Sequence, residues 1–366
     1  MGVKFPTLTD EERKARLDIP AGRIRLVLDT DAKNEIDDQF AVSWALRSPE
    51  RFKVEAVYAA PYCHDCLMKM MGGGQEAPSD EDGEGIGGFE NVTYVNGPGA
   101  GMQASYDELL KLFELLGEDS EGRVFKGSNG YLTDNGGPVE SDAARDLIER
   151  AMSSDEPLYV AAFGAPTNVA SALLLEPELV KKIVVIWLGC QPLEFGHGVE
   201  FNAMQDVEAS RVLLDSGVPL VLIPVMSVVS HLTLTKLEVE QCMLGKSEIS
   251  DYLGSIAMMG FTDVSSAAQM AMFMRLLYMA GREDRSEEYL AQFPTEHVSW
   301  SRIICDISTV AFLKNPGWVS SRMVPSPVLQ DNLQYGPIPE GRHLIRVANY
   351  CNRDLIFGDM LACLNR

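Results

Sequence analysis

The stretch LVLDTDAKNEIDDQFAV (residues 26–42) joins an apolar run to a segment with helical spacing, and five acidic side chains lie within residues 29–38. The run IRLVLD is apolar on both faces, which is typical of a strand buried in a parallel sheet. The segment DDQFAVSWALRS has the period of a helix, and FKVEAVYAA after it reads as a second strand. The stretch therefore predicts the first strand–helix–strand unit of an α/β fold.

The same alternation recurs further along the chain. Between residues 141 and 225, segments with helical spacing alternate with short apolar segments. This repeat predicts one open sheet, mainly parallel but mixed, with right-handed crossovers and helices on both faces. We interpret residues 1–366 as a single large domain, with a loop insertion at about residues 63–101 and a variable, methionine-rich helical region at about residues 245–300.

Composition and charge exclude several classes of partner. With 366 residues and 46% hydrophobic side chains, the chain can bury a large core. A net charge of -22 opposes binding to nucleic acid or to an anionic membrane, because both partners require a basic surface. The start of the chain lacks the apolar core of a signal peptide, and no run is long enough to span a bilayer. We therefore expect a cytoplasmic protein whose seven cysteines are mostly reduced.

Acidic side chains crowd the end of the first predicted strand. Asp29 and Asp31 end that strand, while Asp37 and Asp38 open the following helix. Two carboxylates about 4 Å apart repel by roughly 4 kcal/mol at an effective dielectric of about 20, so several of them need a proton, a basic side chain or a metal ion. Oxygen ligands favour Ca²⁺ or Mg²⁺, whereas Zn²⁺ usually recruits His or Cys. The alternative is a solvated acidic loop in which Asn34 caps the helix.

Later segments extend the pattern of the opening stretch. LVLDTD and DDQFAV are followed by AAFGAPTNVASALLLEPELVKKI (161–183), by WLGC and VEFNAMQDVEASRVLLDSG (within 187–217), and by CDISTVAFLKNP (305–316). In this order the segments resemble the signatures of the inosine-uridine nucleoside hydrolase family over most of residues 23–320. The resemblance implies a Rossmann-like α/β fold, a small-molecule nucleoside substrate, and self-association as a dimer or tetramer.

The resemblance also implies a metal site and a reaction. It assigns Ca²⁺, with Mg²⁺ less expected, to the carboxylates of Asp31, Asp38 and Asp306 and to the main-chain carbonyl of Phe163. The implied reaction hydrolyses the N-glycosidic bond of a ribonucleoside to ribose and a free base. Its transition state resembles an oxocarbenium ion, which nearby carboxylates stabilise. A metal-activated water would attack the sugar, with Asp31 as the general base.

The ribose pocket is implied in the same way. Asp37 would bind the ribose hydroxyls, and Glu200 and Asn202 of the EFN motif would hold the sugar from the other side. The first loop, AKNEI, is two residues longer than is usual in the family. The extra residues could displace Asp31, Asn34 and Glu35 could add sugar contacts, or the loop could merely bulge. The segment APYCHDC replaces the family's Gly-Asn, and His64 within it is a further candidate for a sugar contact.

The group that activates the leaving base stays open. Cys305 stands where purine-cleaving members of the family place a histidine as the leaving-group acid. A thiol, with an ordinary pKa of about 8.5, matches this task less well than imidazole. The candidates are Cys305 itself, His297 and an aromatic stack on Trp300. An equal alternative is that Cys305 is a small buried apolar side chain.

Three alternatives stand beside this interpretation. Cys63, His64 and Cys66 could begin a zinc site, although no second cluster of such ligands follows nearby. The DxD at the strand end could serve a Mg²⁺-dependent phosphohydrolase, which a phosphate-release assay would identify. A relative that binds a ribosyl compound without cleaving it is the third alternative.

Overall fold

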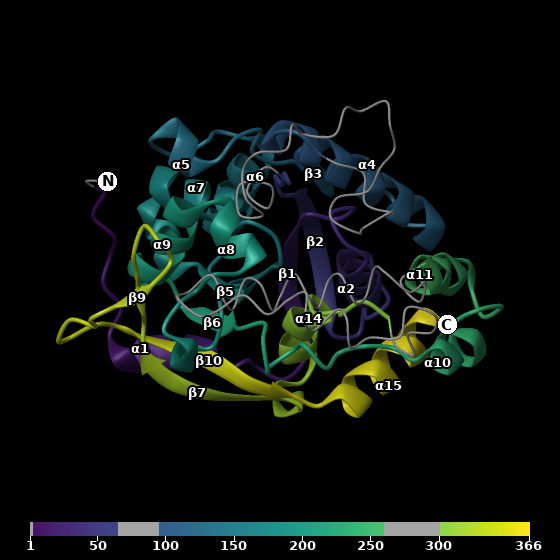
Figure 1. Ribbon diagram of the computed structural model, residues 1–366. Coiled ribbons are helices and arrows are strands. Elements are labelled where there is room, and N and C mark those ends of the chain that lie inside the picture. Colours follow the sequence, from purple (N-terminus) through teal and green to yellow (C-terminus); the bar gives the residue numbers. More distant parts are fainter. Residues whose placement is uncertain (1–2, 65–94, 260–300) are drawn as a thin grey trace, which may run out of the picture.

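A mixed sheet forms the centre of the molecule, whose computed structural model describes residues 3–64, 95–259 and 301–366 (Figure 1). In these residues the sheet has eight strands: β1 (Ile24–Thr30), β2 (Phe52–Ala59), β3 (Val124–Lys126), β4 (Leu158–Ala162), β5 (Ile183–Leu188), β6 (Leu220–Ile223), β7 (Val319–Pro325) and β10 (Leu344–Cys351). The strand order is β3-β2-β1-β4-β5-β6-β10-β7. Only β10 and β7 pair antiparallel among these described strands, so the predicted mainly parallel but mixed sheet is confirmed.

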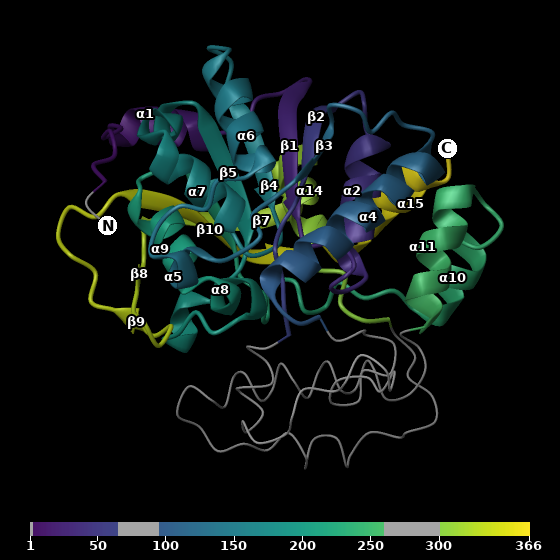
Figure 2. The same ribbon diagram turned by 90° about the horizontal axis from the view of Figure 1, so that it is seen from above.

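Helices cover both faces of the sheet. They are α1 (Asp10–Leu17), α2 (Asp37–Leu46), α4 (Pro98–Leu116), α5 (Leu132–Asn135), α6 (Asp142–Met152), α7 (Thr167–Leu175), α8 (Phe201–Gln205), α9 (Val207–Asp215), α10 (Lys236–Cys242), α11 (Glu248–Met259), α14 (Ile307–Lys314) and α15 (Arg353–Leu364). Helices α4, α14 and α15 pack against α2, while α6 and α9 pack against α7. Figure 2 shows α2, α4 and α15 gathered on one side of the molecule, apart from α5, α7 and α9. None of these described helices is long and apolar enough to cross a membrane.

The chain reverses its direction across the sheet between β1 and β4. These strands are parallel neighbours, and β1 leads through α2 to β2 on one side, while β4 leads through α7 to β5 on the other. Right-handed crossovers then place α2 and α7 on opposite faces. Strands β4 and β5 are buried along their whole length, as expected of a sheet covered twice. The carboxyl ends of β1 and β4 form the switch point at which open α/β sheets bind ligands.

Two parts of the fold extend or change the sequence-based predictions. Helix α4 begins at Pro98, inside the loop insertion that we predicted to reach about residue 101. Proline suits the first turn of a helix, because the N–H that it lacks would have no partner within the helix there. The antiparallel strand β7 and the helix α15 near the C-terminus were not predicted. Residues 65–94 of the predicted insertion and residues 260–300 of the predicted methionine-rich region lie outside the described residues.

Gly101 allows α4 to lie close to the segment after β2. A Cβ atom at Gly101 would lie 1.9 Å from the backbone oxygen of Tyr62, whereas one at Gly358 in α15 would meet no atom within 4 Å. We expect Gly101→Ala to lower the free energy of unfolding by about 1–3 kcal/mol. Gly358→Ala, the matched control in another helix, should raise it by about 0.5–1 kcal/mol. Urea unfolding measures both changes, and an unchanged midpoint for Gly101→Ala would contradict the close approach.

Candidate active site

Four aspartates meet beside the carboxyl end of β1. Asp31 follows β1, Asp37 and Asp38 begin α2, and Asp306 immediately precedes α14. All four are buried, with at most 4% of each residue exposed. We call these four residues the aspartate cluster. The packing of α14 against α2 brings Asp306 to the other three, although it lies far from them in the sequence.

The alternative of a solvated acidic loop capped by Asn34 is wrong. The residue before α2 is Ile36, and no side-chain hydrogen bond caps this described helix. Asn34 is itself buried, and its Nδ2 donates to Asp31 Oδ2 at 2.9 Å. The side chain therefore turns toward the aspartate cluster and away from the helix start.

Burial determines the electrostatics of the aspartate cluster. Burial, and after it the charges of Asp38 and Asp37, raise the pKa of Asp31 well above its ordinary value. Burial and the charge of Asp37 likewise raise the pKa of Asp38. Burial and the charges of the other three aspartates raise the pKa of Asp306. Because buried carboxylates cannot all stay ionised without compensation, the cluster requires protons or a cation.

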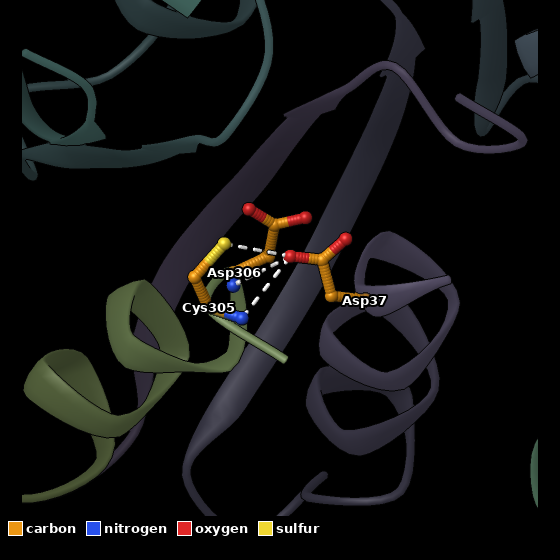
Figure 3. A group of neighbouring side chains, drawn as sticks. All are labelled: Asp37, Cys305 and Asp306. Carbon is orange, nitrogen blue, oxygen red and sulfur yellow. Dashed lines mark hydrogen bonds between the residues drawn. The ribbon is translucent and has the colours of Figure 1, made fainter. Parts of the chain in front are cut away.

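Asp37 faces Cys305 and Asp306 across the contact between α2 and α14 (Figure 3). Asp37 Oδ2 accepts hydrogen bonds from the backbone N–H groups of Cys305 and Asp306 and from the Cys305 thiol, at 3.1, 3.4 and 2.8 Å. One ligand atom from each of these three residues lies within 4.8 Å of the others, so together they could hold a metal ion. This group shares only Asp306 with the predicted carboxylate set of Asp31, Asp38 and Asp306.

The donor atoms of the site fit a hard cation. Carboxylates supply most of them, which suits Ca²⁺ or Mg²⁺. Burial and the charge of Asp37 raise the pKa of the Cys305 thiol well above its usual range, so the sulfur stays protonated. In this arrangement the thiol is a neutral hydrogen-bond donor to Asp37. His297 and Trp300, the other candidates for leaving-group activation, lie outside the described residues.

The turn after β4 lies against Asp31. The Phe163 N–H donates to the Asp29 carbonyl at 2.9 Å, and a Cβ atom on Gly164 would lie 3.1 Å from Asp31 Oδ1. The Asn202 amide donates to the carbonyls of Phe163 and Leu188, at 3.4 and 3.1 Å. The structure thus places Phe163 and Asn202 beside the cluster, although the Asn202 amide is already engaged with backbone carbonyls.

Glu200 organises the start of α8. Its carboxylate accepts hydrogen bonds from the backbone N–H groups of Cys190, Asn202 and Ala203, at 3.0–3.2 Å. Burial raises the pKa of Glu200 to about 7, although these bonds favour the charged form. In this arrangement Glu200 is a helix cap, so the sugar contact that we predicted for it would have to coexist with the three backbone contacts.

His64 lies beside the first loop. The Val95 N–H donates to His64 Nδ1 at 3.0 Å, so the hydrogen-bond network assigns the ring proton to Nε2, which donates to Asn34 Oδ1 at 3.2 Å. Both ring nitrogens are thereby engaged, which opposes a role for His64 as a zinc ligand. Cys66, the third residue of the alternative zinc site, lies outside the described residues.

Sequence reasoning missed two partners of the acidic residues. The Thr30 hydroxyl donates to Asp38 Oδ1. Arg302, a buried residue, places Nη1 2.8 Å from Glu35 Oε2. Crowded carboxylates are stabilised by a nearby basic side chain, so the acidic stretch could have predicted that a Lys or Arg lies beside it. It did not indicate which of the 31 Lys and Arg residues would supply the charge.

Known proteins resemble this chain in sequence. The model of a family described as inosine-uridine preferring nucleoside hydrolase matches residues 84–356. The putative pyrimidine-specific ribonucleoside hydrolase RihB of Shigella boydii is 36% identical over 84 residues, which cover 22% of this chain and 35% of the relative. The pyrimidine-specific ribonucleoside hydrolase RihA of an Enterobacter strain is 36% identical over 88 residues, which cover 23% of this chain and 28% of the relative. The matched segments thus span about a third of these relatives' length.

Solved structures resemble the whole fold. A plant nucleoside hydrolase, PpNRh1, has a TM-score of 0.62 at 17% identity, over 93% of this chain and 99% of that chain. The purine-preferring ribonucleoside hydrolase from Gardnerella vaginalis has a TM-score of 0.60 at 18% identity, over 93% of this chain and 98% of that chain. At these identities the likeness concerns the fold, and it agrees with the predicted single α/β domain.

Proposed function

Since this chain belongs to the inosine-uridine preferring nucleoside hydrolase family, we propose that it hydrolyses the N-glycosidic bond of a ribonucleoside to ribose and a free base. The observation that carries the proposal is the buried aspartate cluster at the switch point between β1 and β4. Cleavage of this bond develops positive charge on the sugar, and fixed carboxylates in a site that excludes water stabilise such charge.

We propose Ca²⁺ as the cation of this site. The residues that would hold it are Asp31, Asp38 and Asp306, together with the main-chain carbonyl of Phe163. Support comes from the hard oxygen donors and from the burial that raises the pKa values of these carboxyl groups. Mg²⁺ fits less well, because it usually keeps several of its own waters. When bound, a divalent cation lowers the pKa of a coordinated water and orients it.

Asp31 and Asp37 have separate tasks in the proposal. Asp31 is the general base, because it lies within the aspartate cluster and Asn34 Nδ2 holds its Oδ2 in place by a hydrogen bond. Three donors converge on Asp37 Oδ2, so we assign Oδ1 of the same carboxylate to a ribose hydroxyl. Each aspartate thus has one oxygen anchored by the protein.

Cys305 acts through Asp37 in this proposal. Its thiol donates to Asp37 Oδ2, which supports a positioning role for Cys305 over direct activation of the leaving base, for which it was one of three candidates. Glu200 and Asn202 bind backbone groups, which supports a role in shaping the pocket wall. Their contacts with the sugar stay predictions.

A reducing-sugar assay over a panel of purine and pyrimidine ribonucleosides tests the proposed function. We expect ribose release that thorough chelation lowers by about 10²-fold or more and that added Ca²⁺ restores. Phosphate release from a phosphate ester, with no ribose from any nucleoside, would favour the phosphohydrolase alternative. Nucleosides that raise the melting temperature but yield no ribose over hours would favour the binding protein.

A further inference from the structure

The loop between β1 and α2, residues 31–36, has a constrained backbone. The Asn34 N–H donates to the Asp31 carbonyl at 3.0 Å and closes a turn. Lys33, inside this turn, has a φ of 83°, a left-handed conformation that lysine rarely adopts. Such strain persists only where surrounding contacts over-determine the conformation. The side chains on either side of the turn should therefore make contacts that hold it.

Asn34 and His64 make the first of these contacts. The network gives His64 Nε2 the proton, so Nε2 must meet the oxygen of the Asn34 amide, at 3.2 Å. The amide can then point only its nitrogen at Asp31, where Nδ2 donates to Oδ2 at 2.9 Å. His64 and Asn34 are buried, with 3% and 8% of the residue exposed. This chain of donors therefore fixes the rotation of the Asp31 carboxylate.

Glu35 and Arg302 make the second contact. Their ion pair joins Glu35 Oε2 to Arg302 Nη1 at 2.8 Å, with only 5% of the arginine side chain exposed. Arg302 stands four residues before Asp306, so the pair fastens the first loop to the segment that carries the last aspartate of the cluster. The pair thus joins two segments 267 positions apart in the sequence.

We infer that these two contacts form one brace, which positions the Asp31 carboxylate relative to Asp306 for cation binding. The brace comprises Asn34, Glu35, His64 and Arg302. These are positioning residues, because they act through Asp31 and the loop. The inference rests on the proposed function, because it assigns the longer first loop the role of positioning Asp31 in the proposed cation site. Groups that orient the ligands of a metal typically change affinity by about 10–100-fold when they are lost.

Calcium titration calorimetry without nucleoside tests the first contact. Asn34→Leu keeps a similar side-chain volume and removes the donor to Asp31, and His64→Phe removes the ring proton. We expect each variant to weaken Ca²⁺ binding by about 10–100-fold and, at saturating Ca²⁺, to lower kcat more than it changes KM. His64→Gln, whose amide can donate to Asn34, should restore most of the affinity. Lys33→Arg, the control in the same loop, should bind like the unchanged protein.

A double-variant comparison tests the second contact. Glu35→Gln and Arg302→Met each remove one side of the ion pair. If the pair acts as one unit, the double variant binds Ca²⁺ no more weakly than the weaker of the two single variants. Losses that add up in the double variant would show that the two residues act independently, and would overturn this half of the brace.

The outcomes separate the brace from the proposed function. Unchanged Ca²⁺ affinity and kcat in Asn34→Leu would overturn the brace, even where the protein releases ribose. Weakened Ca²⁺ binding in the variants, with no ribose from any form of the protein, would support the brace and contradict the proposed function. Circular dichroism shows which variants fold, and if His64→Phe does not fold, Asn34→Leu and His64→Gln decide the first contact.

Discussion

Asp31→Asn is expected to lower kcat for ribose release by about 10³-fold while leaving the protein folded. The amide has nearly the shape of the carboxylate, but it carries no charge and cannot accept the proton that a general base must take. It also replaces a charged oxygen ligand of the proposed cation site with a neutral amide oxygen, which binds a cation more weakly. A reducing-sugar assay at saturating nucleoside and Ca²⁺ measures the effect. Near-normal turnover would remove Asp31 from the mechanism.

The stability of the same variant distinguishes lost chemistry from lost folding. Burial, and after it the charges of Asp38 and Asp37, raise the pKa of Asp31, so the charged form of this carboxylate is disfavoured in the folded state. A neutral side chain relieves the repulsion, and we expect the chelated Asp31→Asn protein to melt at the same temperature as the unchanged protein or higher. Asp155→Asn, at a fully exposed side chain that pairs with Lys182, is the matched control and should retain full activity.

The chelated protein is expected to lose stability as the pH rises from about 4 to about 7. Burial raises the pKa of Glu200 from 4.5 to about 7 and the pKa of Asp29 from 3.8 to about 7. Within this window the folded state keeps protons that the unfolded chain has released, so raising the pH favours unfolding. At one pKa unit per about 1.4 kcal/mol, the loss above the window is at most roughly 3 kcal/mol for Glu200 and roughly 4 kcal/mol for Asp29. Urea unfolding at several pH values, with chelator present, measures the slope.

Calcium is expected to stabilise the protein more at pH 8 than at pH 5. The pKa values of Asp31, Asp38 and Asp306 are all raised, so at low pH bound protons already compensate the cluster. At high pH the carboxylates are ionised, and a bound cation compensates their charges. The cation also displaces fewer protons when it binds at high pH. Thermal melts with Ca²⁺ or with chelator measure how far Ca²⁺ raises the melting temperature at each pH. A calcium-induced shift that is the same at both would contradict cation binding by these carboxylates.

Local patterns were sufficient for the central fold. The apolar run of β1 and the helical spacing of α2 reflect contacts between residues two to four positions apart, which the sequence displays directly. The placement of Asp31 after a buried strand, with Asp37 and Asp38 opening the next helix, then followed from the geometry of parallel sheets. Strand β7 escaped prediction because its antiparallel pairing with β10 depends on tertiary context and leaves no comparable periodic signal.

The sequence by itself determined the α/β alternation and the acidic character of the strand ends. It also carried the resemblance from which we propose a Ca²⁺ site and a ribonucleoside substrate. Only the tertiary structure decided which groups meet there. It turned Asn34 toward Asp31 instead of the helix start, directed the Cys305 thiol to Asp37, and brought Arg302 to Glu35. The reason is physical: periodicity records a residue's neighbours along one element, whereas these partners lie on different elements, and only the packing of the elements brings them within hydrogen-bond distance.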